Sequence, residues 1–389
     1  MSFRINKKDK DTKARIGVLE TSHGKVATPC FLPIGTKGSV KSLNNDELHN
    51  LGAEMILSNT YHLWESPGDE LIRKAGGLHR FMNWDRPIFT DSGGYQVFSL
   101  GEKAVKKGSN PFNVRVSDKG VSFQSGIDGR KMQLTPKLSV QIQSNLGSDV
   151  TVVLDQFTGE IENYDKVKET VRRTTLWAKK SKKELGKLIA DDVVNPGQLQ
   201  LGIVQGGMIE DLRKQSAEEV REIGFDGYCI GGVAVGGESS EMQYKAIEMS
   251  LPHLEEEKFK HLFGVGTPEQ IIQAVARGMD SFDCVIPTRE ARHGRLYIFK
   301  DDSYETIDVG KSEYKESFKP MDANCNCYAC TNHTSAYMHH LYKSGELLYM
   351  RLATLHNLNF YLTLMKKIRD SIEEGKFDKL INTYAQISI

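Results

Sequence analysis

The stretch Leu199 to Gly207, with the sequence LQLGIVQGG, combines an apolar run of strand length with a polar residue and two glycines at its end. Such a run, closed by a turn signal, is typical of a strand buried on both faces of a sheet. Seven further runs share this character: Phe31 to Gly35, Met55 to Asn59, Pro87 to Asp91, Val150 to Asp155, Tyr228 to Gly231, His261 to Val265 and Phe282 to Ile286. The sequence therefore predicts eight buried strands, the first of those named here over Leu199 to Gln205.

Amphipathic stretches with helical periodicity lie between the predicted strands. They include Thr135 to Asn145, Tyr164 to Leu185, Ile209 to Ile223, Glu241 to Ser250 and Pro268 to Ala276. The last begins with a proline, which a helix tolerates in its first turn. Eight strands alternating with helices predict an α/β protein built on a (β/α)8 TIM barrel. The alternation alone leaves an open doubly wound sheet as the alternative.

Two segments depart from the alternation. Residues Tyr95 to Lys131 are rich in glycine and serine and contain alternating valines, which predicts a β-hairpin insertion on the barrel rim. Around Asp301 to Asp322, charged and turn residues replace the periodicity. We therefore expect a catalytic barrel over residues 1–308, with an N-terminal extension of turns and the insertion near 95–131. A smaller zinc-binding domain with a C-terminal helix should occupy residues 309–389.

The composition points to a soluble, cytoplasmic protein. The 389 residues include 51 basic and 51 acidic side chains, so no net charge attracts a polyanion to the whole surface. The N-terminus, MSFRINKKDKDTK, is charged, and no apolar run is long enough to cross a bilayer. Cys30, Cys229 and Cys284 lie singly in apolar stretches, as buried thiols do. If the protein binds nucleic acid, we expect a local basic patch to do so.

The other three cysteines are gathered in Cys325-Asn326-Cys327-Tyr328-Ala329-Cys330, and His356 follows further along the chain. Three thiolates and one imidazole are the four soft ligands that suit tetrahedral Zn²⁺, and four protein ligands leave no open position for water or substrate. We therefore expect one structural zinc ion per chain. His333, His339 and His340 are rival fourth ligands, and a group of buried thiols without metal is the alternative interpretation.

Polar residues and glycines recur where the predicted strands end. In barrels the carboxyl ends of the strands meet at one rim, where the reacting groups lie. Carboxamide and carboxylate edges suit a heterocyclic base, and glycine lets a ligand approach the backbone closely. The rim residues are Asn59, Asp91 to Gly94, Asp155, Gln205 to Gly207, Gly231, Gly232, Gly264 to Gly266 and Asp283. Turns also collect glycine, but the coincidence at one rim favours a binding site.

Three aspartates among these residues, Asp91, Asp155 and Asp283, are candidates for chemistry. Two carboxylates across one pocket can divide the work of glycosyl transfer, because one attacks an anomeric carbon while the other gives and takes a proton at the leaving group. Asp283 lies between Phe282 and Cys284 in an apolar run, where a carboxylate needs hydrogen bonds or a chemical role. Each aspartate alone could instead be a helix cap or an ion-pair partner.

A basic segment, Pro287 to Arg295 (PTREARHGR), follows the last predicted strand. It contains three arginines and one histidine but only one glutamate, so the segment is basic. The planar guanidinium suits phosphates and base edges. A solvated charge run is the alternative, but the position next to Asp283 favours contact with RNA.

Several motifs taken together resemble one family. They are Ser58 to Leu63 (SNTYHL), Thr90 to Leu100 (TDSGGYQVFSL), Gly202 to Gly207 (GIVQGG), Ile230 to Gly232 (IGG), Gly264 to Pro268 (GVGTP), Phe282 to Arg289 (FDCVIPTR) and the cysteine cluster with His356. In this order, over about residues 15–370, they resemble the bacterial-type tRNA-guanine transglycosylases of the queuosine pathway. The resemblance implies a cytoplasmic homodimer that exchanges the wobble guanine of tRNA for a 7-deazaguanine base, queuine or its 7-aminomethyl precursor.

The resemblance also implies roles for individual residues. Asp283 matches the nucleophile that attacks ribose C1′ and forms a covalent intermediate, and Asp91 matches the general acid and base. The residues matching base contacts, with Tyr95 and Phe263 as stacking walls, are Ser92, Gly93, Gly94, Tyr95, Asp155, Gln205, Gly232, Val233 and Phe263. The residues matching tRNA contacts are Gly264, Val265, Gly266, Thr267, Thr288, Arg289 and Arg292. The guanine must leave its stack to reach such a pocket.

Two positions depart from the bacterial pattern. Glu-Cys usually follows the pocket aspartate, whereas Gln156-Phe157 follows Asp155 here, and Gly237 stands where a glutamate is usual, with Glu238 one place late. That glutamate faces the aminomethyl ammonium of the precursor base, so its loss predicts a preference for queuine and its larger cyclopentenediol substituent. Phe157 argues against a preference for queuine, because its side chain is bulkier than cysteine and leaves less space for the larger base.

Two other functions remain open at this point. A non-catalytic tRNA-binding partner subunit would have a similar barrel and zinc site without the nucleophile, and the presence of both Asp91 and Asp283 argues against it. A zinc-dependent hydrolase would need an exposed metal with a water ligand. Its activity would be lost on chelation while the subdomain stayed folded.

Overall fold

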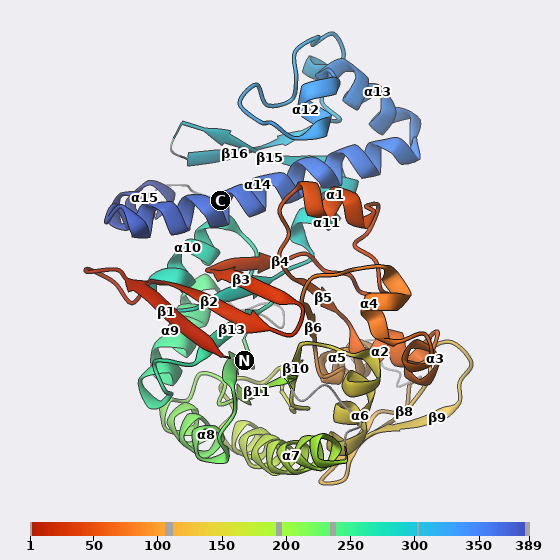
Figure 1. The fold of residues 1–389 in the computed structure, drawn as a ribbon, viewed down its shortest axis with the longest axis vertical. Helices are drawn as coiled ribbons and strands as arrows, with labels where there is room; N and C mark the ends of the chain where they lie inside the picture. Colours follow the sequence, from red (N-terminus) through yellow and green to blue (C-terminus); the bar gives the residue numbers. More distant parts are fainter. Residues whose placement is uncertain (1, 106–111, 192–196, 234–238, 302, 386–389) are drawn as a thin grey trace.

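A ring of eight parallel strands forms the centre of the molecule (Figure 1). The computed structural model describes residues 2–105, 112–191, 197–233, 239–301 and 303–385. Around the ring the strands follow chain order, and a parallel bridge between Ile34 and Leu57 joins its first and second members. The strands are β4 (Cys30–Leu32), β5 (Ile56–Ser58), β6 (Ile88–Thr90), β10 (Val150–Val152), β11 (Leu199–Val204), β12 (Gly227–Ile230), β13 (Phe259–Phe263) and β14 (Ser281–Asp283). The predicted (β/α)8 barrel is confirmed.

Helices follow the strands and surround the barrel. They are α1 (Asn45–Asn50), α2 (Thr60–Glu65), α3 (Asp69–Lys74), α4 (Gly77–Met82), α5 (Gly94–Val105), α6 (Pro136–Leu146), α7 (Tyr164–Ala190), α8 (Glu210–Ile223), α9 (Ser240–Ser250), α10 (Pro268–Ala276) and α11 (Ile286–Arg292), with a 3₁₀ turn at Leu251–His253. Their starts carry the expected caps: the Thr135 and Thr267 hydroxyls accept amide protons in the first turns of α6 and α10, each of which begins with a proline.

The last strand ends earlier than predicted. We expected a strand over Phe282 to Ile286, but β14 stops at Asp283 and α11 begins at Ile286. Pro287 lies in the first turn of that helix, where its missing amide proton costs nothing. Similarly, β10 ends at Val152, so Asp155 lies beyond the strand. Both aspartates nevertheless remain at the carboxyl end of the barrel.

The insertion after β6 is only in part what the sequence predicted. It opens with helix α5, and its strands β7 (Arg115–Ser117) and β8 (Gly120–Gln124) form the predicted hairpin, which β9 (Lys131–Leu134) extends to a three-stranded antiparallel sheet. Val97 and Phe98 of α5 are buried in the main core. This burial stabilises a helix in a segment whose glycines and β-branched residues favour other conformations.

An antiparallel sheet, rather than the expected turns, precedes the barrel. It consists of β1 (Phe3–Lys8), β2 (Arg15–Thr21) and β3 (Gly24–Thr28). The buried Arg15 guanidinium donates two hydrogen bonds, of 2.8 and 2.6 Å, to the carboxylate of Asp280, immediately before β14. This bidentate ion pair fixes the sheet at the amino ends of the strands, opposite the rim that carries the candidate site.

The C-terminal region lies across one side of the barrel (Figure 1). It consists of the hairpin β15 (Arg295–Lys300) and β16 (Ser303–Asp308), a 3₁₀ turn at Ser312–Tyr314, and the helices α12 (Tyr328–Asn332), α13 (Ser335–Ser344), α14 (Leu347–Glu373) and α15 (Phe377–Ala385). A small core of its own includes Leu296, Val309, Met338 and Leu352. The boundary between residues 308 and 309 stays a prediction. Among the described helices, none is both long and apolar enough to span a membrane.

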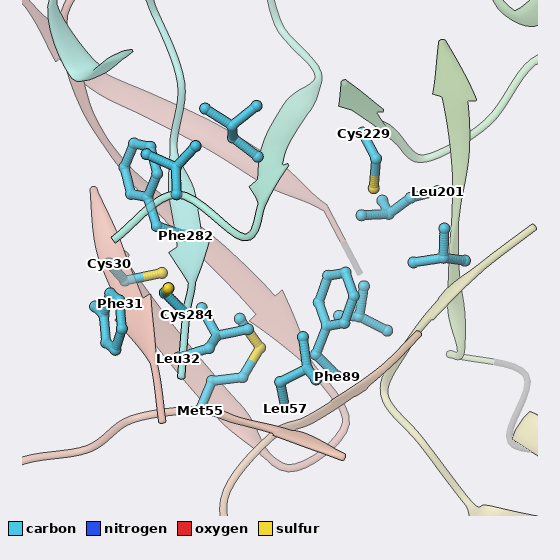
Figure 2. Packing of buried hydrophobic residues seen from close by; sticks show 14 of the residues in the cluster. Cys30, Phe31, Leu32, Met55, Leu57, Phe89, Leu201, Cys229, Phe282 and Cys284 are labelled. Carbon is cyan, nitrogen blue, oxygen red and sulfur yellow. The ribbon is translucent and has the colours of Figure 1, made fainter. Parts of the chain in front are cut away.

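Large buried apolar side chains pack on the strands of the barrel (Figure 2). Leu57 and Phe89 face each other in the register of β5 and β6, and both are almost fully buried. Complete burial of a leucine or phenylalanine side chain contributes about 1.5–3 kcal/mol. The polar residues of the rim therefore stand on a rigid apolar base.

Candidate active site and metal cluster

A cavity of about 670 Å³ opens at the carboxyl ends of the strands, a volume typical of a small-molecule site. Its lining combines strand-end carboxylates, glycines and aromatic rings. Of the predicted site residues, those that line it are Asp91, Ser92, Gly93, Tyr95, Asp155, Gly232, Val233, Phe263, Gly264, Asp283 and Arg289. The structure thus brings both candidate catalytic aspartates into one cavity, together with most of the predicted base contacts.

Asp91 lies immediately after β6, between the amino ends of two short helices. Its Oδ1 accepts the amide protons of Thr60 (2.9 Å) and Gly93 (3.2 Å), and its Oδ2 accepts bonds from the side chains of Asn59 and Gln96. Burial raises the pKa of Asp91 from 3.8 to about 7, and the charge of Asp283 adds to the rise while the amide bonds oppose it. A carboxyl group with this pKa exchanges protons readily at neutral pH.

Asp283 is the last residue of β14 and is buried, with 7% of its surface exposed at the cavity. Its Oδ1 accepts hydrogen bonds from the backbone N–H of Gly264 (3.4 Å) and from His261 Nε2 (3.2 Å). The sequence analysis missed His261, whose imidazole is fully buried in β13. Only the pairing of β13 with β14 brings the two side chains together.

Asp155 and Gln205 form a polar pair at one side of the cavity. The Gln205 side-chain N–H donates to Asp155 Oδ2 at 2.7 Å. Burial raises the pKa of Asp155 from 3.8 to about 6, while this bond from Gln205 opposes the rise. Gln205 itself is buried, and a Cβ on Gly232 would lie 2.4 Å from its Oε1. Glycine at position 232 therefore leaves room for the amide that holds the carboxylate.

A buried arginine that the sequence analysis missed joins the loops after β11 and β12. Arg213 Nε donates to the carbonyl of Gly207, and its Nη1 donates to that of Gly231, both at 2.8 Å. Burial lowers the pKa of this guanidinium to about 9. Gly94, also predicted as a base contact, lies behind the cavity, where its N–H donates to Ser92 Oγ at 3.2 Å. Both residues support the lining from behind.

Aromatic rings form the walls of the cavity. Tyr95 is 44% exposed and stacks on Phe157, with ring centroids 5.6 Å apart and planes 24° apart. Phe157 also packs edge-on against Phe98. On the other side, Phe263 contacts the His261 ring in a T-shaped arrangement at 4.3 Å. Phe157 therefore occupies part of the space beside Tyr95, the ring expected to stack on a base.

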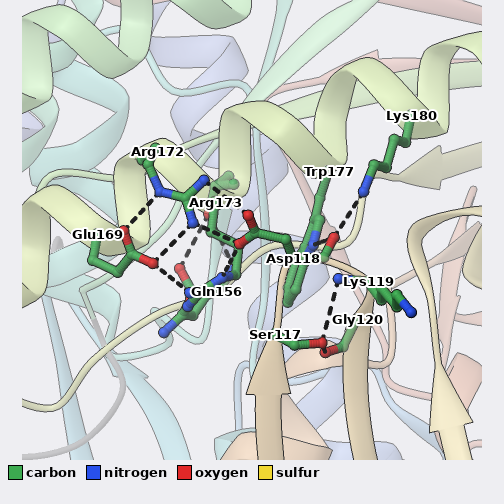
Figure 3. A network of polar contacts seen from close by, with 11 residues as sticks. Ser117, Asp118, Lys119, Gly120, Gln156, Glu169, Arg172, Arg173, Trp177 and Lys180 are labelled. Carbon is green, nitrogen blue, oxygen red and sulfur yellow. Dashed lines mark hydrogen bonds and ion pairs between the residues drawn. The ribbon is translucent and has the colours of Figure 1, made fainter.

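The loop that carries Asp155 and Phe157 is tied to α7 and to the insertion (Figure 3). The Gln156 backbone N–H donates to the Thr174 hydroxyl, and its side-chain oxygen accepts a bond from Arg173. Arg172 and Arg173 both bond the carboxylate of Asp118, in the turn between β7 and β8. This ion-pair network lowers the pKa of Asp118 to about 2 through its hydrogen bonds with Arg172 and Arg173.

The predicted RNA-contacting residues differ in how far their side chains are exposed. Gly264 and Arg289 line the cavity and are exposed. The side chains of Val265 and Thr288 are buried, and Thr267 caps α10, so any contact from these three with RNA would come largely through the backbone. The remaining two are Gly266, whose carbonyl accepts a bond from Tyr361, and Arg292, which is half-buried and donates to the carbonyl of Thr288.

The four predicted metal ligands meet at one point in the C-terminal region. The sulfurs of Cys325, Cys327 and Cys330 lie 3.7, 3.6 and 3.3 Å from His356 Nδ1. Tetrahedral zinc, with bonds of about 2.3 Å to sulfur and 2.05 Å to nitrogen, separates S and N by about 3.6 Å, so the donor set fits such an ion. The rival His339 instead bonds the carbonyl of Val309. His356 is the histidine that joins the cysteines.

Contacts around the cluster orient its ligands. His356 Nε2 lies 2.8 Å from the carbonyl of Tyr297, which makes it the protonated nitrogen and leaves Nδ1 as the acceptor that faces the sulfurs. The next residue, Asn357, donates to the carbonyls of Pro287 and Arg295, both at 3.0 Å. Adjacent residues of α14 thus contact the cluster and the helix that follows Asp283.

A second group of potential ligands, His23, His79 and Asp149, lies at the amino ends of the strands. His23 Nδ1 is 2.7 Å from Asp149 Oδ1, which is the length of a direct hydrogen bond rather than of two ligands on one ion. The two imidazoles stack with centroids 3.5 Å apart. This group ties the turn between β2 and β3 to the barrel.

Comparison with known proteins agrees with the geometry. The family model described as queuine tRNA-ribosyltransferase matches residues 9–388. Three proteins named queuine tRNA-ribosyltransferase are similar along nearly their whole length. That of Caldanaerobacter subterraneus subsp. tengcongensis is 44% identical over 97% of this chain and 94% of its own. That of Halothermothrix orenii is 44% identical over 96% of this chain and 94% of its own. That of Lactococcus lactis subsp. cremoris is 45% identical over 96% of this chain and 92% of its own. The chain belongs to the queuine tRNA-ribosyltransferase family of transferases.

Proposed function

We propose that this enzyme exchanges the guanine at the wobble position of tRNA for a 7-deazaguanine base through a covalent enzyme–ribose intermediate. The observation that carries the proposal is the pair of aspartates in one cavity. Asp283 is held by hydrogen-bond donors, whereas the pKa of Asp91 is raised to about 7. Two carboxyl groups in such different surroundings suit different roles in glycosyl transfer.

In the first half of the exchange, a carboxylate oxygen of Asp283 attacks ribose C1′ of a guanosine turned out of its stack. The bond between C1′ and the base breaks, and its electron pair stays with the guanine, which takes a proton from Asp91. In the second half, the incoming base gives a proton to Asp91 and attacks C1′, and Asp283 leaves. Proton and electron counts balance, and the enzyme ends as it began.

The recognition of the base is assigned to the surrounding polar and aromatic groups. The Asp155 carboxylate, held by Gln205, can accept the N–H donors on the edge of a guanine-like base. Tyr95 and Phe263 supply ring faces for stacking. Arg289, exposed at the cavity mouth, suits the flanking phosphates.

A structural zinc ion is the metal we assign to Cys325, Cys327, Cys330 and His356. The ion would hold the C-terminal region together and take no part in the exchange, because four protein ligands complete its coordination. This assignment disfavours a zinc-dependent hydrolase. We also infer a cytoplasmic homodimer; exposed apolar side chains of the C-terminal region, Phe318 and Leu347, are 79% and 78% accessible and suit a subunit contact.

Of the two candidate bases, we propose that the enzyme prefers queuine. Gly237, where the family has a glutamate, lies outside the described residues. Phe157 lines the cavity and stacks on Tyr95, so its bulk acts against the larger base. Loss of the partner for an ammonium group is the stronger effect, because an unpaired charge in a partly buried site costs more than a tight fit. Competition between the two bases for unmodified tRNA tests this preference, and favoured incorporation of the aminomethyl base would refute it.

Trapping the intermediate tests the main proposal. Enzyme incubated with an unmodified anticodon stem-loop and then denatured should carry an RNA adduct, and peptide mapping should locate it on Asp283. Asp283→Asn should lose the adduct and at least about a thousandfold in exchange rate. Asp226→Asn is the matched control, because Asp226 bonds the backbone at the opposite end of the barrel. Retained exchange in Asp283→Asn would overturn the proposal and favour a mechanism without this nucleophile.

The runner-up function, a non-catalytic tRNA-binding subunit, predicts a different outcome. The wild-type chain alone would bind the stem-loop but form no adduct and exchange no labelled guanine. The paired carboxylates and the raised pKa of Asp91 favour the enzyme, since a binding subunit has no use for a proton carrier in a cavity.

A further inference from the structure

The surroundings of Asp283 contain a side chain for which the proposed exchange has so far given no role. His261 is fully buried, and its ring lies between Ser281 Oγ, 2.8 Å from Nδ1, and Asp283 Oδ1, 3.2 Å from Nε2. The pairing of β13 with β14 sets this chain of three side chains, because His261 faces Ser281 in the register and Asp283 lies two residues further along.

Aromatic rings hold the imidazole in this orientation. Phe89 lies 4.7 Å from the His261 ring centroid, and Phe263 packs against it edge-on at 4.3 Å. A buried histidine with both nitrogens engaged has little rotational freedom. Asp283 Oδ1 is an acceptor whether the imidazole is neutral or charged, so Nε2 carries the proton in this contact.

We propose that His261 is a positioning residue for the nucleophile, and this inference rests on the proposed function. Its Nε2–H and the Gly264 N–H bond the same oxygen, Oδ1, of Asp283. They fix the plane of the carboxylate and leave Oδ2 as the oxygen that attacks ribose C1′.

The same two donors assist the second half of the exchange. When Oδ2 is bonded to C1′, Oδ1 is the carbonyl oxygen of the resulting ester. As the incoming base attacks C1′, the bond between C1′ and Oδ2 breaks, and its electron pair returns to the carboxylate. Donors already aimed at Oδ1 stabilise the negative charge that develops there. His261 therefore assists formation of the intermediate by orienting the carboxylate, and its breakdown by stabilising the charge on the departing carboxylate.

A pair of amide substitutions isolates the contribution of each ring nitrogen. The side-chain nitrogen of glutamine reaches the position of Nε2, whereas that of asparagine reaches only that of Nδ1. We expect His261→Gln to keep most of the wild-type rate of adduct formation in single turnover. His261→Asn and His261→Phe should be about 10- to 100-fold slower, with KM for the stem-loop and the melting temperature nearly unchanged.

The outcomes separate this inference from the proposed function. Equal rates for His261→Gln and His261→Asn, or a wild-type rate for His261→Phe, would overturn the role of His261. If His261→Phe does not fold, the comparison of the two amide variants still decides. Adduct formation that persists in Asp283→Asn would instead overturn the proposed nucleophile, and with it the basis of this inference.

The breakdown step gives a second readout that a purely structural role would not alter. Purified adduct is mixed with excess guanine, and release of the stem-loop is followed over time. His261→Asn should release it about 10-fold more slowly than His261→Gln. Release at the same rate in both variants contradicts a role for Nε2 in the departure of Asp283.

Discussion

The metal cluster and the reaction cavity both bring polar side chains to one point, but the chain reaches these two arrangements by different routes. Three of the four ligands of the cluster lie within six residues, and one helix supplies the fourth. The cavity takes residues from the ends of all eight barrel strands, which are spread over most of the sequence. A local cluster can be recognised from spacing, whereas the cavity exists only once the barrel has closed.

This difference predicts different failures on substitution. Losing a ligand should unfold part of the molecule, because metal-binding energy is folding energy. Losing a cavity residue should stop the chemistry and leave the fold intact, because the apolar base of the barrel does not depend on it.

Substitution of a metal ligand should give the largest effect. His356→Ala should abolish stoichiometric metal binding, lower the melting temperature by at least about 5 °C and expose the C-terminal region to protease. His340→Ala is the matched control, because His340 is exposed on the neighbouring helix and lies outside the cluster. Equal metal content and stability in both variants would contradict a structural role for the cluster.

Asp91→Asn should slow adduct formation by about 10²- to 10⁴-fold, the usual contribution of a general acid. Circular dichroism and stem-loop binding should remain those of the wild type, in contrast to His356→Ala. A variant that lost its fold together with its activity would show that substitutions in the cavity and in the cluster have the same consequence.

An effect of intermediate size is expected from pH, because both the rate of adduct formation and the stability of the fold depend on the protonation of Asp91. Departure of guanine needs protonated Asp91, so with a pKa of about 7 the rate of adduct formation should fall as pH rises above 7. Because the pKa of Asp91 is higher in the folded than in the unfolded state, the folded state binds this proton more tightly. The resulting contribution to the free energy of unfolding is complete below pH 3.8 and is lost as pH rises from 3.8 to about 7. Asp91→Asn should therefore gain melting temperature over the wild type at pH 8 and not at pH 4. A flat rate profile for the wild type would exclude Asp91 as the acid.

Phe157→Cys should change base choice rather than rate. Removal of the ring opens space beside Tyr95, so incorporation of queuine relative to the aminomethyl base should rise by about 10-fold, as measured by kcat/KM for each base. Phe98→Leu serves as the control, because Phe98 packs behind Phe157 and does not line the cavity. An unchanged ratio would show that Phe157 does not limit the size of the base.

The smallest effect is expected in the network of Figure 3. Asp118→Asn weakens the contacts of Arg172 and Arg173, and of these two arginines Arg173 holds Gln156. Because these ion pairs are largely exposed, KM for the base should rise by only about two- to fivefold. A loss as large as that of Asp91→Asn would mean that the insertion takes part in catalysis directly.

The sequence predicted those parts of the fold that local patterns determine. The eight strands follow from apolar runs closed by glycine or polar residues, and the metal ligands follow from cysteine spacing. Helix α5 was missed because Gly94, Val97 and Gly101 in its sequence favour other structures, and burial of Val97 and Phe98 in the core overrides that preference. Strand β1 was missed because charged residues conceal the alternation of Phe3 and Ile5.

The parts of the site that escaped prediction depend on contacts between distant segments. His261 had a visible signal, a lone histidine in an apolar strand, but its partner Asp283 depends on strand register. Arg213 resembles any charged residue of an amphipathic helix until the turn after β11 folds over it. The choice of His356 over its rivals likewise rests on the position of α14 rather than on spacing.

Helix α14 places His356 and Asn357 side by side, the first on the sulfurs and the second on the carbonyl of Pro287. One turn of α14 therefore couples the cysteine cluster to the helix that follows Asp283. A change in the geometry of the cluster should therefore first disturb α11, the helix that carries Arg289 and Arg292 and begins three residues after Asp283.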